Sequence, residues 1–186
     1  MTIDEFIQDA TRRMDKSVEA ALHEFNTVRT GRASAALLDH VRVDYYGTPT
    51  PLNQLSTINV PEPRMLTIQP FDPSSVKAIE KALMESDLGL TPSNDGKIIR
   101  LPIPQLTEER RKELVKVVRQ RAEDGRIAVR NVRRDVMHHL KELVTRGDVG
   151  GDEERRAEER LQKLTDDHVH KIDEFLKRKE AEILEV

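Results

Sequence analysis

The chain has 186 residues, a formal net charge of −3 and no cysteine, and its charged fraction of 35% exceeds the roughly 25% of an ordinary globular protein. The missing cysteines exclude a disulfide framework and thiolate chemistry, and no apolar run approaches the roughly 20 residues that a membrane-spanning helix needs. The first residues lack the basic and apolar regions of a secretion signal. We therefore expect a cytoplasmic protein that is not inserted in a membrane.

The distribution of proline predicts the domain organisation. All nine prolines lie within residues 49–104, and neither flanking segment contains one. Proline removes a backbone donor and clashes with the preceding helical turn, so the middle segment cannot be a long helix, whereas the flanks show an uninterrupted helical pattern. We predict a helical domain from residues 1–30 and 105–186, with a second domain of residues 31–104 inserted after its first helix.

The first predicted helix begins with a capping box, in which Thr2 is the N-cap residue and Glu5 follows three positions later. Apolar residues then recur at alternating three- and four-residue steps. This pattern predicts a helix that runs to about Arg29. Thr30-Gly31 is the first natural break, because glycine is favoured just past a helix end.

The middle segment shows short strand patterns separated by turn residues. The predicted strands are residues 41–45, 56–60, 65–69 and 98–101. Residues 47–51 are predicted as a turn-rich loop. Ser74 or Ser75 can cap a helix that closes near Leu88. These elements predict a small mixed domain.

Two further helices are predicted after residue 105. The second helix begins at Thr107, and its unbroken apolar stripe predicts about 38 residues, a rod of roughly 55–60 Å. A glycine-rich turn ends it, and Asp152 can cap a third helix that runs to about Leu184. Three long amphipathic helices cannot bury their stripes alone, so we expect an antiparallel bundle.

The surplus positive charge lies on the second helix. Residues 107–146 contain twelve Lys and Arg against seven Asp and Glu, whereas residues 147–186 contain eight against thirteen. A projection at about 100° per residue places eight cations on one side, roughly a quarter turn from the apolar stripe. This basic ridge consists of Lys112, Lys116, Arg119, Arg126, Arg130, Arg133, Arg134 and Lys141. Glu123 is the one acid among them.

The basic ridge has two interpretations. A solvated helix face with salt bridges between neighbouring turns would mix the two signs of charge. Here the acids gather on another side of the helix, at Glu113, Asp124, Asp135 and Glu142. This segregation favours a surface that binds the phosphates of a polyanion, because arginines bind phosphate through two parallel hydrogen bonds.

Other residue patterns do not indicate catalysis. His138-His139 and His168-Val-His170 invite a metal site, but close neighbours on a helix point in different directions, and no cysteine or well-placed carboxylate completes a ligand shell. No nucleophile elbow, P-loop or dinucleotide fingerprint is present. Tyr45-Tyr46 is interpreted as the core and surface pair of a strand rather than a platform for stacked bases. We expect no enzyme, no metal and no cofactor.

Five segments resemble the bacterial ribosome recycling factor family in order and spacing. They are Arg29–Ala33, Asp44–Pro51, Ser86–Leu90, Leu106–Lys112 and Val129–Asp135. The resemblance covers essentially the whole chain and implies an α+β fold, an antiparallel three-helix bundle with an inserted small β/α/β domain, arranged in an L that is similar in outline to transfer RNA. It also implies a flexible hinge at Thr30, Gly31, Pro104 and Gln105.

The resemblance implies a monomer that binds the post-termination ribosome across the aminoacyl and peptidyl sites of the large subunit. With elongation factor G and GTP it would split the subunits, so that messenger and transfer RNA leave. Contacts with ribosomal RNA are implied for Arg29, Arg32, Arg111, Arg130 and Arg133, and the basic ridge adds Arg119, Arg126 and Arg134.

The residue pattern, taken without the resemblance, is compatible with two other functions. One is a helical coiled-coil interaction or chaperone-like protein with a basic RNA-binding face, which would need exposed apolar surface. The other is a nuclease or another RNA-directed enzyme, which would need clustered carboxylates or a histidine pair in a pocket.

Overall fold

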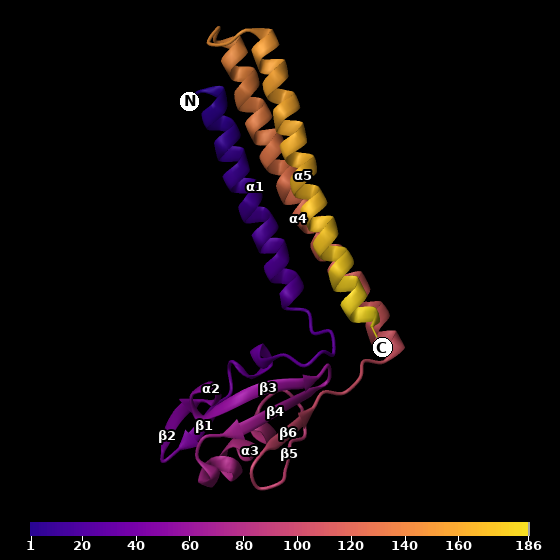
Figure 1. Cartoon of the computed structure of the whole chain (residues 1–186). Coiled ribbons are helices and arrows are strands. Elements are labelled where there is room, and N and C mark those ends of the chain that lie inside the picture. Colours follow the sequence, from indigo (N-terminus) through magenta and orange to yellow (C-terminus); the bar gives the residue numbers. More distant parts are fainter. Residues whose placement is uncertain (186) are drawn as a thin grey trace. The chain divides into compact units, whose positions relative to one another are not determined.

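The computed structural model describes residues 1–185, which form two compact units (Figure 1). The helical unit consists of Met1–Thr30 and Glu108–Glu185, and the sheet unit consists of Gly31–Thr107. One unit contains long helices, while the other contains the strands and short helices. The predicted α+β class is therefore confirmed. Within residues 1–185 no helix is both long and apolar enough to cross a membrane.

The helical unit consists of α1 (Ile3–Asn26), α4 (Glu108–Thr145) and α5 (Gly151–Leu184), which lie side by side (Figure 1). The predicted capping box of α1 is present. Thr2 Oγ1 accepts a hydrogen bond from the Glu5 amide at 3.2 Å, and Glu5 Oε2 accepts one from the Thr2 amide at 2.7 Å. These bonds satisfy amides that the first helical turn leaves without partners.

Two predicted helix ends differ from the structure. Helix α1 ends at Asn26 instead of about Arg29, because Thr27 closes the last turn, with its amide bonded to the carbonyls of that turn and its hydroxyl donating to Glu24 O at 2.7 Å. Gly150 is the N-cap residue of α5, so the prediction that Asp152 caps this helix is wrong. Asp152 lies in the first turn, where an acid is favourable beside the positive end of the helix dipole.

Each helix buries one apolar stripe in the seam of the bundle. The helices approach closely at Gly125 of α4, where an added Cβ atom would lie 3.0 Å from Ala21 Cβ and 3.1 Å from Ile172 Cδ1. The absence of a side chain at this position lets three helices come together. Two polar side chains of α5 are also buried: Thr165 donates its hydroxyl to Leu161 O, and His168 has its Nε2 atom 2.6 Å from Asp15 Oδ1 on α1.

The sheet unit contains two antiparallel sheets. A four-stranded sheet has the order β3 (Ser56–Glu62), β4 (Met65–Pro70), β6 (Ile99–Pro102) and β5 (Ser93–Asn94). The other sheet pairs β1 (Arg42–Tyr45) with β2 (Thr48–Pro51). The helical elements are η1 (Ala35–Leu38), α2 (Leu52–Leu55), η2 (Pro73–Ser75) and α3 (Val76–Glu85). Apolar side chains of η1, α2 and α3 pack with those of the strands in one core.

The prediction of a loop at residues 47–51 is wrong, because Thr48–Pro51 forms strand β2. The turn before it has Tyr46 at φ 51° and Gly47 at φ 81°, and two successive residues with positive φ match the twist of a tight hairpin. A two-stranded sheet tolerates Pro49 and Pro51, since each strand is an edge and not every amide needs a partner.

The predicted N-cap position of α3 is confirmed, because Ser75 is its N-cap residue, but a short helix precedes it. Asp72 caps η2, since its Oδ1 accepts from the Ser74 amide at 3.0 Å. Ser75 makes no side-chain cap bond for α3. Tyr45 is half-buried and donates its hydroxyl to Asp72 Oδ2 at 3.1 Å, whereas Tyr46 is 80% exposed. The aromatic pair therefore has one inner and one outer member.

Candidate nucleic-acid interface

The basic ridge lies on the surface of α4. Six of its eight cations are exposed, and only Arg126 and Arg133 are half-buried. The helix places them on one side because α4 is continuous from residue 108 to residue 145. An uninterrupted helix keeps side chains in register over its whole length, so the cations form a line along the unit.

Acids of α5 neutralise part of this line. Arg126 has only 20% of its side chain exposed, and its Nε atom donates to Asp173 Oδ1 at 2.8 Å. Burial opposes the charged form of Arg126, but hydrogen bonds to Asp173 and Glu123 outweigh it and raise the pKa of the guanidinium. The Nε atom of Arg119 donates in the same way to Glu180 on α5, at 2.8 Å.

For Arg119 and Arg126 the salt-bridge interpretation is therefore the better one. The projection of one helix could not show this, because the partner acids belong to another helix. Asp173 and Glu180 are seven residues apart, which is two turns of one face of α5. A projection of the third helix as well would have indicated an acidic edge that can pair with the ridge.

Two ridge arginines have amide partners instead of carboxylates. Arg133 Nη1 donates to Gln162 Oε1 at 3.3 Å, and Arg134 Nη2 donates to Asn131 Oδ1. In residues 1–185 neither arginine has a carboxylate within ion-pair distance, and the same is true of Lys116. An amide orients a guanidinium without cancelling its charge. These cations are therefore the ones best prepared to bind an anion.

The arginines outside the ridge have different settings. Arg111 is half-buried in the first turns of α4, and its Nε atom has no hydrogen-bond partner in the part of the chain that the structure describes. Arg29 follows the end of α1 and is exposed. Arg32 is also exposed but belongs to the sheet unit. The helical unit thus contains every proposed arginine except Arg32.

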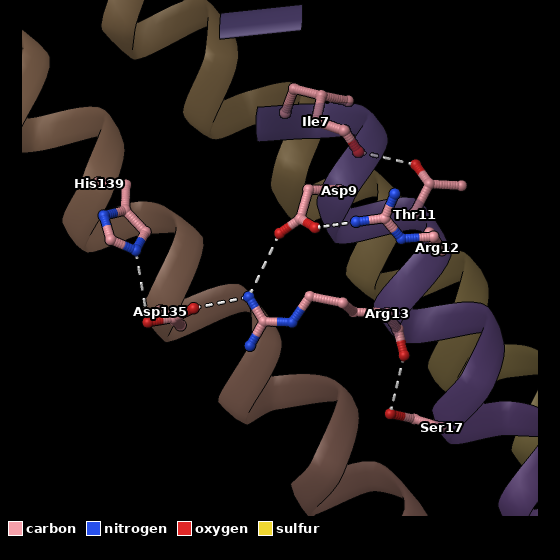
Figure 2. Close-up of polar contacts among 8 residues, drawn as sticks. All are labelled: Ile7, Asp9, Thr11, Arg12, Arg13, Ser17, Asp135 and His139. Carbon is pink, nitrogen blue, oxygen red and sulfur yellow. Dashed lines mark hydrogen bonds and ion pairs between the residues drawn. The ribbon is translucent and has the colours of Figure 1, made fainter. Parts of the chain in front are cut away.

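The opposite edge of α4 is closed by contacts with α1 (Figure 2). Arg13 of α1 lies between two acids, with its Nη1 atom 2.6 Å from Asp135 Oδ2 and 3.4 Å from Asp9 Oδ2. The hydrogen bond with Asp135 raises the pKa of Arg13, and the same bond lowers the pKa of Asp135. His139 stacks on Phe6 with ring centroids 5.3 Å apart. On this edge the charges satisfy one another.

His138 and His170 each contact a carboxylate four residues later on their own helix. His138 Nε2 lies 3.1 Å from Glu142, and His170 Nε2 lies 3.5 Å from Glu174. In the described residues there is no group of three or more His, Cys, Asp or Glu side chains that could bind a metal ion. The two histidine pairs of the sequence are therefore not brought together as ligands.

The connecting segments are anchored to the sheet unit at one turn. The Ala33 amide donates to Pro63 O at 2.7 Å, and the Ile103 amide donates to Arg64 O at 2.8 Å. Both connections therefore start from the β3–β4 turn. Gly31 has φ 78°, and an added Cβ atom would lie 3.1 Å from Leu106 Cγ. Thr30, Gly31, Pro104 and Gln105 lie just outside the two anchors and outside every helix and strand.

These features define an α+β protein with an inserted sheet unit and a basic helical surface. The chain matches the family model described as ribosome recycling factor over residues 21–184. It is 57% identical to the ribosome-recycling factor of Rubrobacter xylanophilus over 180 residues, 97% of each chain, and 56% identical to that of Bacillus subtilis over 182 residues, 98% of each chain. The chain belongs to the ribosome recycling factor family.

Solved structures agree with this assignment. The chain resembles a solution structure of the ribosome recycling factor with a TM-score of 0.74 and 43% identity, over 99% of this chain and 98% of that one. A second similar structure is described as models for the T. thermophilus ribosome recycling factor and the E. coli elongation factor G bound to the E. coli post-termination complex. The TM-score is 0.64 and the identity 48%, over 99% of this chain and 100% of that one.

Proposed function

We propose that this protein acts in ribosome recycling: it binds the ribosome after termination and, with elongation factor G and GTP, promotes subunit splitting and release of messenger and transfer RNA. The observation that supports this most is the family match at more than 50% identity over nearly the whole chain. A relative at 48% identity is described together with elongation factor G on a post-termination complex. The family is not enzymatic, so the GTPase supplies the chemistry.

The same proposal includes the place of action and the state of the protein. Ribosomes and elongation factor G are cytoplasmic in bacteria, so we propose a cytoplasmic factor. We propose that it acts as a monomer. The alternative of a coiled-coil or chaperone-like protein has no support from the family match, which extends through both units of the chain.

The ribosomal RNA would be bound chiefly through arginines whose charge has no carboxylate partner. Arg133 and Arg134 are the strongest candidates, since only amides orient them. Arg29, Arg32, Arg111 and Arg130 would add contacts with the backbone of large-subunit RNA. Arg119 and Arg126 would contribute less, because acids of α5 already bind their side chains. Phosphate contacts of this kind make affinity fall steeply with salt.

The segments at Thr30-Gly31 and Pro104-Gln105 are proposed as the hinge between the units. Support comes from the two anchors at Ala33 and Ile103, beyond which the chain has no regular structure until the helices. A hinge of a few loop residues can absorb a large change in backbone angles. The sheet unit would then transmit the action of the GTPase while the arginines stay on the large subunit.

Light scattering of post-termination ribosomes tests the function directly. On mixing with this protein, elongation factor G and GTP, we expect scattering to fall as subunits separate, and we expect no fall without the GTPase. A helical unit made by joining Arg29 to Leu106 through a Gly-Ser linker should fold and bind ribosomes but not split them. Splitting at the full rate by that unit alone would contradict the role of the hinge.

A further inference from the structure

One carboxylate lies inside the basic ridge. Glu123 points two oxygens at two ridge arginines: Oε2 is 3.0 Å from Arg126 Nη1, and Oε1 is 3.6 Å from Arg130 Nη1. Its side chain is 46% exposed. A ligand that approaches Arg130 therefore meets the Glu123 carboxylate as well.

The bundle does not depend on this carboxylate for its packing. Arg126 has a second acid, since its Nη2 atom lies 2.7 Å from Asp173 Oδ1 on α5. That contact between the helices remains if Glu123 is neutralised. An ion pair with a side chain as accessible as that of Glu123 contributes little to stability, because water screens it. The position of Glu123 is better explained by its effect on the charge of the ridge.

For Arg130 the situation is different, because Glu123 is its one carboxylate partner in the described chain. A phosphate that binds Arg130 has to displace this carboxylate from the guanidinium. After binding, the phosphate lies close to a like charge, which weakens the contact. Glu123 thus opposes the binding that its neighbours favour.

We propose that Glu123 limits the affinity of the basic ridge for ribosomal RNA and thereby sets how fast the protein leaves the large subunit after splitting. This rests on the proposed function, because it assumes that the ridge binds large-subunit RNA. A factor that acts on one ribosome after another has to dissociate between rounds. Among variants of one interface, differences in affinity arise mostly in the dissociation rate.

The variant Glu123→Gln tests the proposal, because it keeps the size of the side chain and removes its charge. We expect it to bind purified large subunits about three-fold more tightly, as one like charge about 6 Å away in a watery surface implies. Because Glu123 weakens the contact of Arg130 with phosphate, its loss should make the slope of log affinity against log salt steeper, by less than the roughly 0.7–0.9 of one whole contact. Anisotropy of an N-terminally labelled protein measures both, and the melting temperature should not change.

Turnover separates this role from a purely structural one. With the protein in excess over ribosomes, Glu123→Gln should split subunits at the normal rate. With ribosomes in excess, the rate should fall about as much as dissociation slows, because the factor stays bound. A variant that merely disturbed the fold would be slow under both conditions.

Asp124→Asn is the matched control, since this neighbour accepts a hydrogen bond from Gln120 at 3.0 Å and lies away from the ridge. It should leave affinity and turnover unchanged. Unchanged or weaker binding by Glu123→Gln would overturn the proposal. Arg130→Ala, measured in parallel, should weaken binding; if it does not, the proposed RNA-binding surface itself fails, which is a separate result.

Discussion

The two edges of α4 contain the same types of charged residue, but these residues have different partners. On the edge that faces α1, Arg13 and Asp135 approach to 2.6 Å and Arg121 and Glu24 to 3.6 Å, so each charge meets its opposite. On the ridge, Arg133 and Arg134 bind only amides. The number of charges therefore does not distinguish the two edges, whereas the presence or absence of an opposite charge beside each arginine does.

The largest effect should come from reversing a ridge charge. We expect Arg133→Glu to weaken binding to large ribosomal subunits by about 30-fold or more, since a charge-assisted hydrogen bond contributes about 2 kcal/mol and the new acid repels phosphate. Arg133→Ala should lose less affinity than Arg133→Glu. Pelleting of the protein with subunits measures the change, and circular dichroism should show the same helicity.

Glu142→Gln is the control for this comparison, because Glu142 lies on the acidic side of α4 and pairs with His138. We expect its ribosome affinity to stay within a factor of about two, since exposed charges beyond a Debye length of about 8–10 Å are screened. Equal losses from both variants would mean that the two edges do not differ in function.

The next largest effect is expected on stability, from substitutions at Gly125 in the seam of the bundle. Gly125→Val should lower the free energy of unfolding by about 1–3 kcal/mol, because its added carbons have no room beside Ala21 and Ile172. Gly125→Ala should be nearly neutral, since a gain of about 1 kcal/mol in helix propensity is offset by crowding. Urea denaturation measures both. A stabilised valine variant would show that the helices do not approach so closely.

On the edge of α4 that faces α1, we expect a smaller loss of stability. Asp135→Asn should lower stability by about 0.5–1 kcal/mol at neutral pH, as is typical of an accessible pair with good geometry, and should leave ribosome binding unchanged. Because Arg13 lowers the pKa of Asp135 in the folded protein, the pair stabilises above the unfolded pKa and loses its effect as pH falls through the folded pKa. Wild type and variant should therefore converge in denaturation curves at acid pH.

The smallest effect is expected at the start of α5. Glu158 lies one turn after Glu154, and it raises the pKa of Glu154. A raised carboxyl pKa means that the ionised form is disfavoured once pH rises through the folded value. Glu154→Gln should therefore stabilise at neutral pH by about 0.2–0.5 kcal/mol, and the gain should vanish in acid. A loss of stability at neutral pH would mean that Lys141 or Arg155 dominates this carboxylate.

Sequence patterns were sufficient for the long helices and for four of the strands, because burial periodicity over many residues has few competing explanations. They failed at β2, because proline usually indicates a loop. In a hairpin both strands are edges, so a proline that lacks an amide hydrogen is tolerated. The patterns placed the N-cap of α3 at Ser75 but did not show the short helix η2 before it, which Asp72 caps.

For the candidate site, the sequence indicated which side of α4 is basic but not which cations are neutralised. Asp173 and Glu180 come from another helix, and only the packing of α5 against α4 brings them to Arg126 and Arg119. The same packing places the Gln162 amide beside Arg133. Contacts between residues far apart in sequence cannot be obtained from the projection of one helix.

The central claim is that the arginines of α4 without a carboxylate partner bind ribosomal RNA. The salt dependence of binding tests this claim most directly. The measurement is the affinity of wild type, of the double variant Arg133→Ala with Arg134→Ala, and of Arg13→Ala for large subunits over a series of salt concentrations. Two lost phosphate contacts should reduce the slope of log affinity against log salt by about 1.4–1.8 in the double variant, while Arg13→Ala keeps the wild-type slope. Equal slopes for all three proteins would contradict the claim.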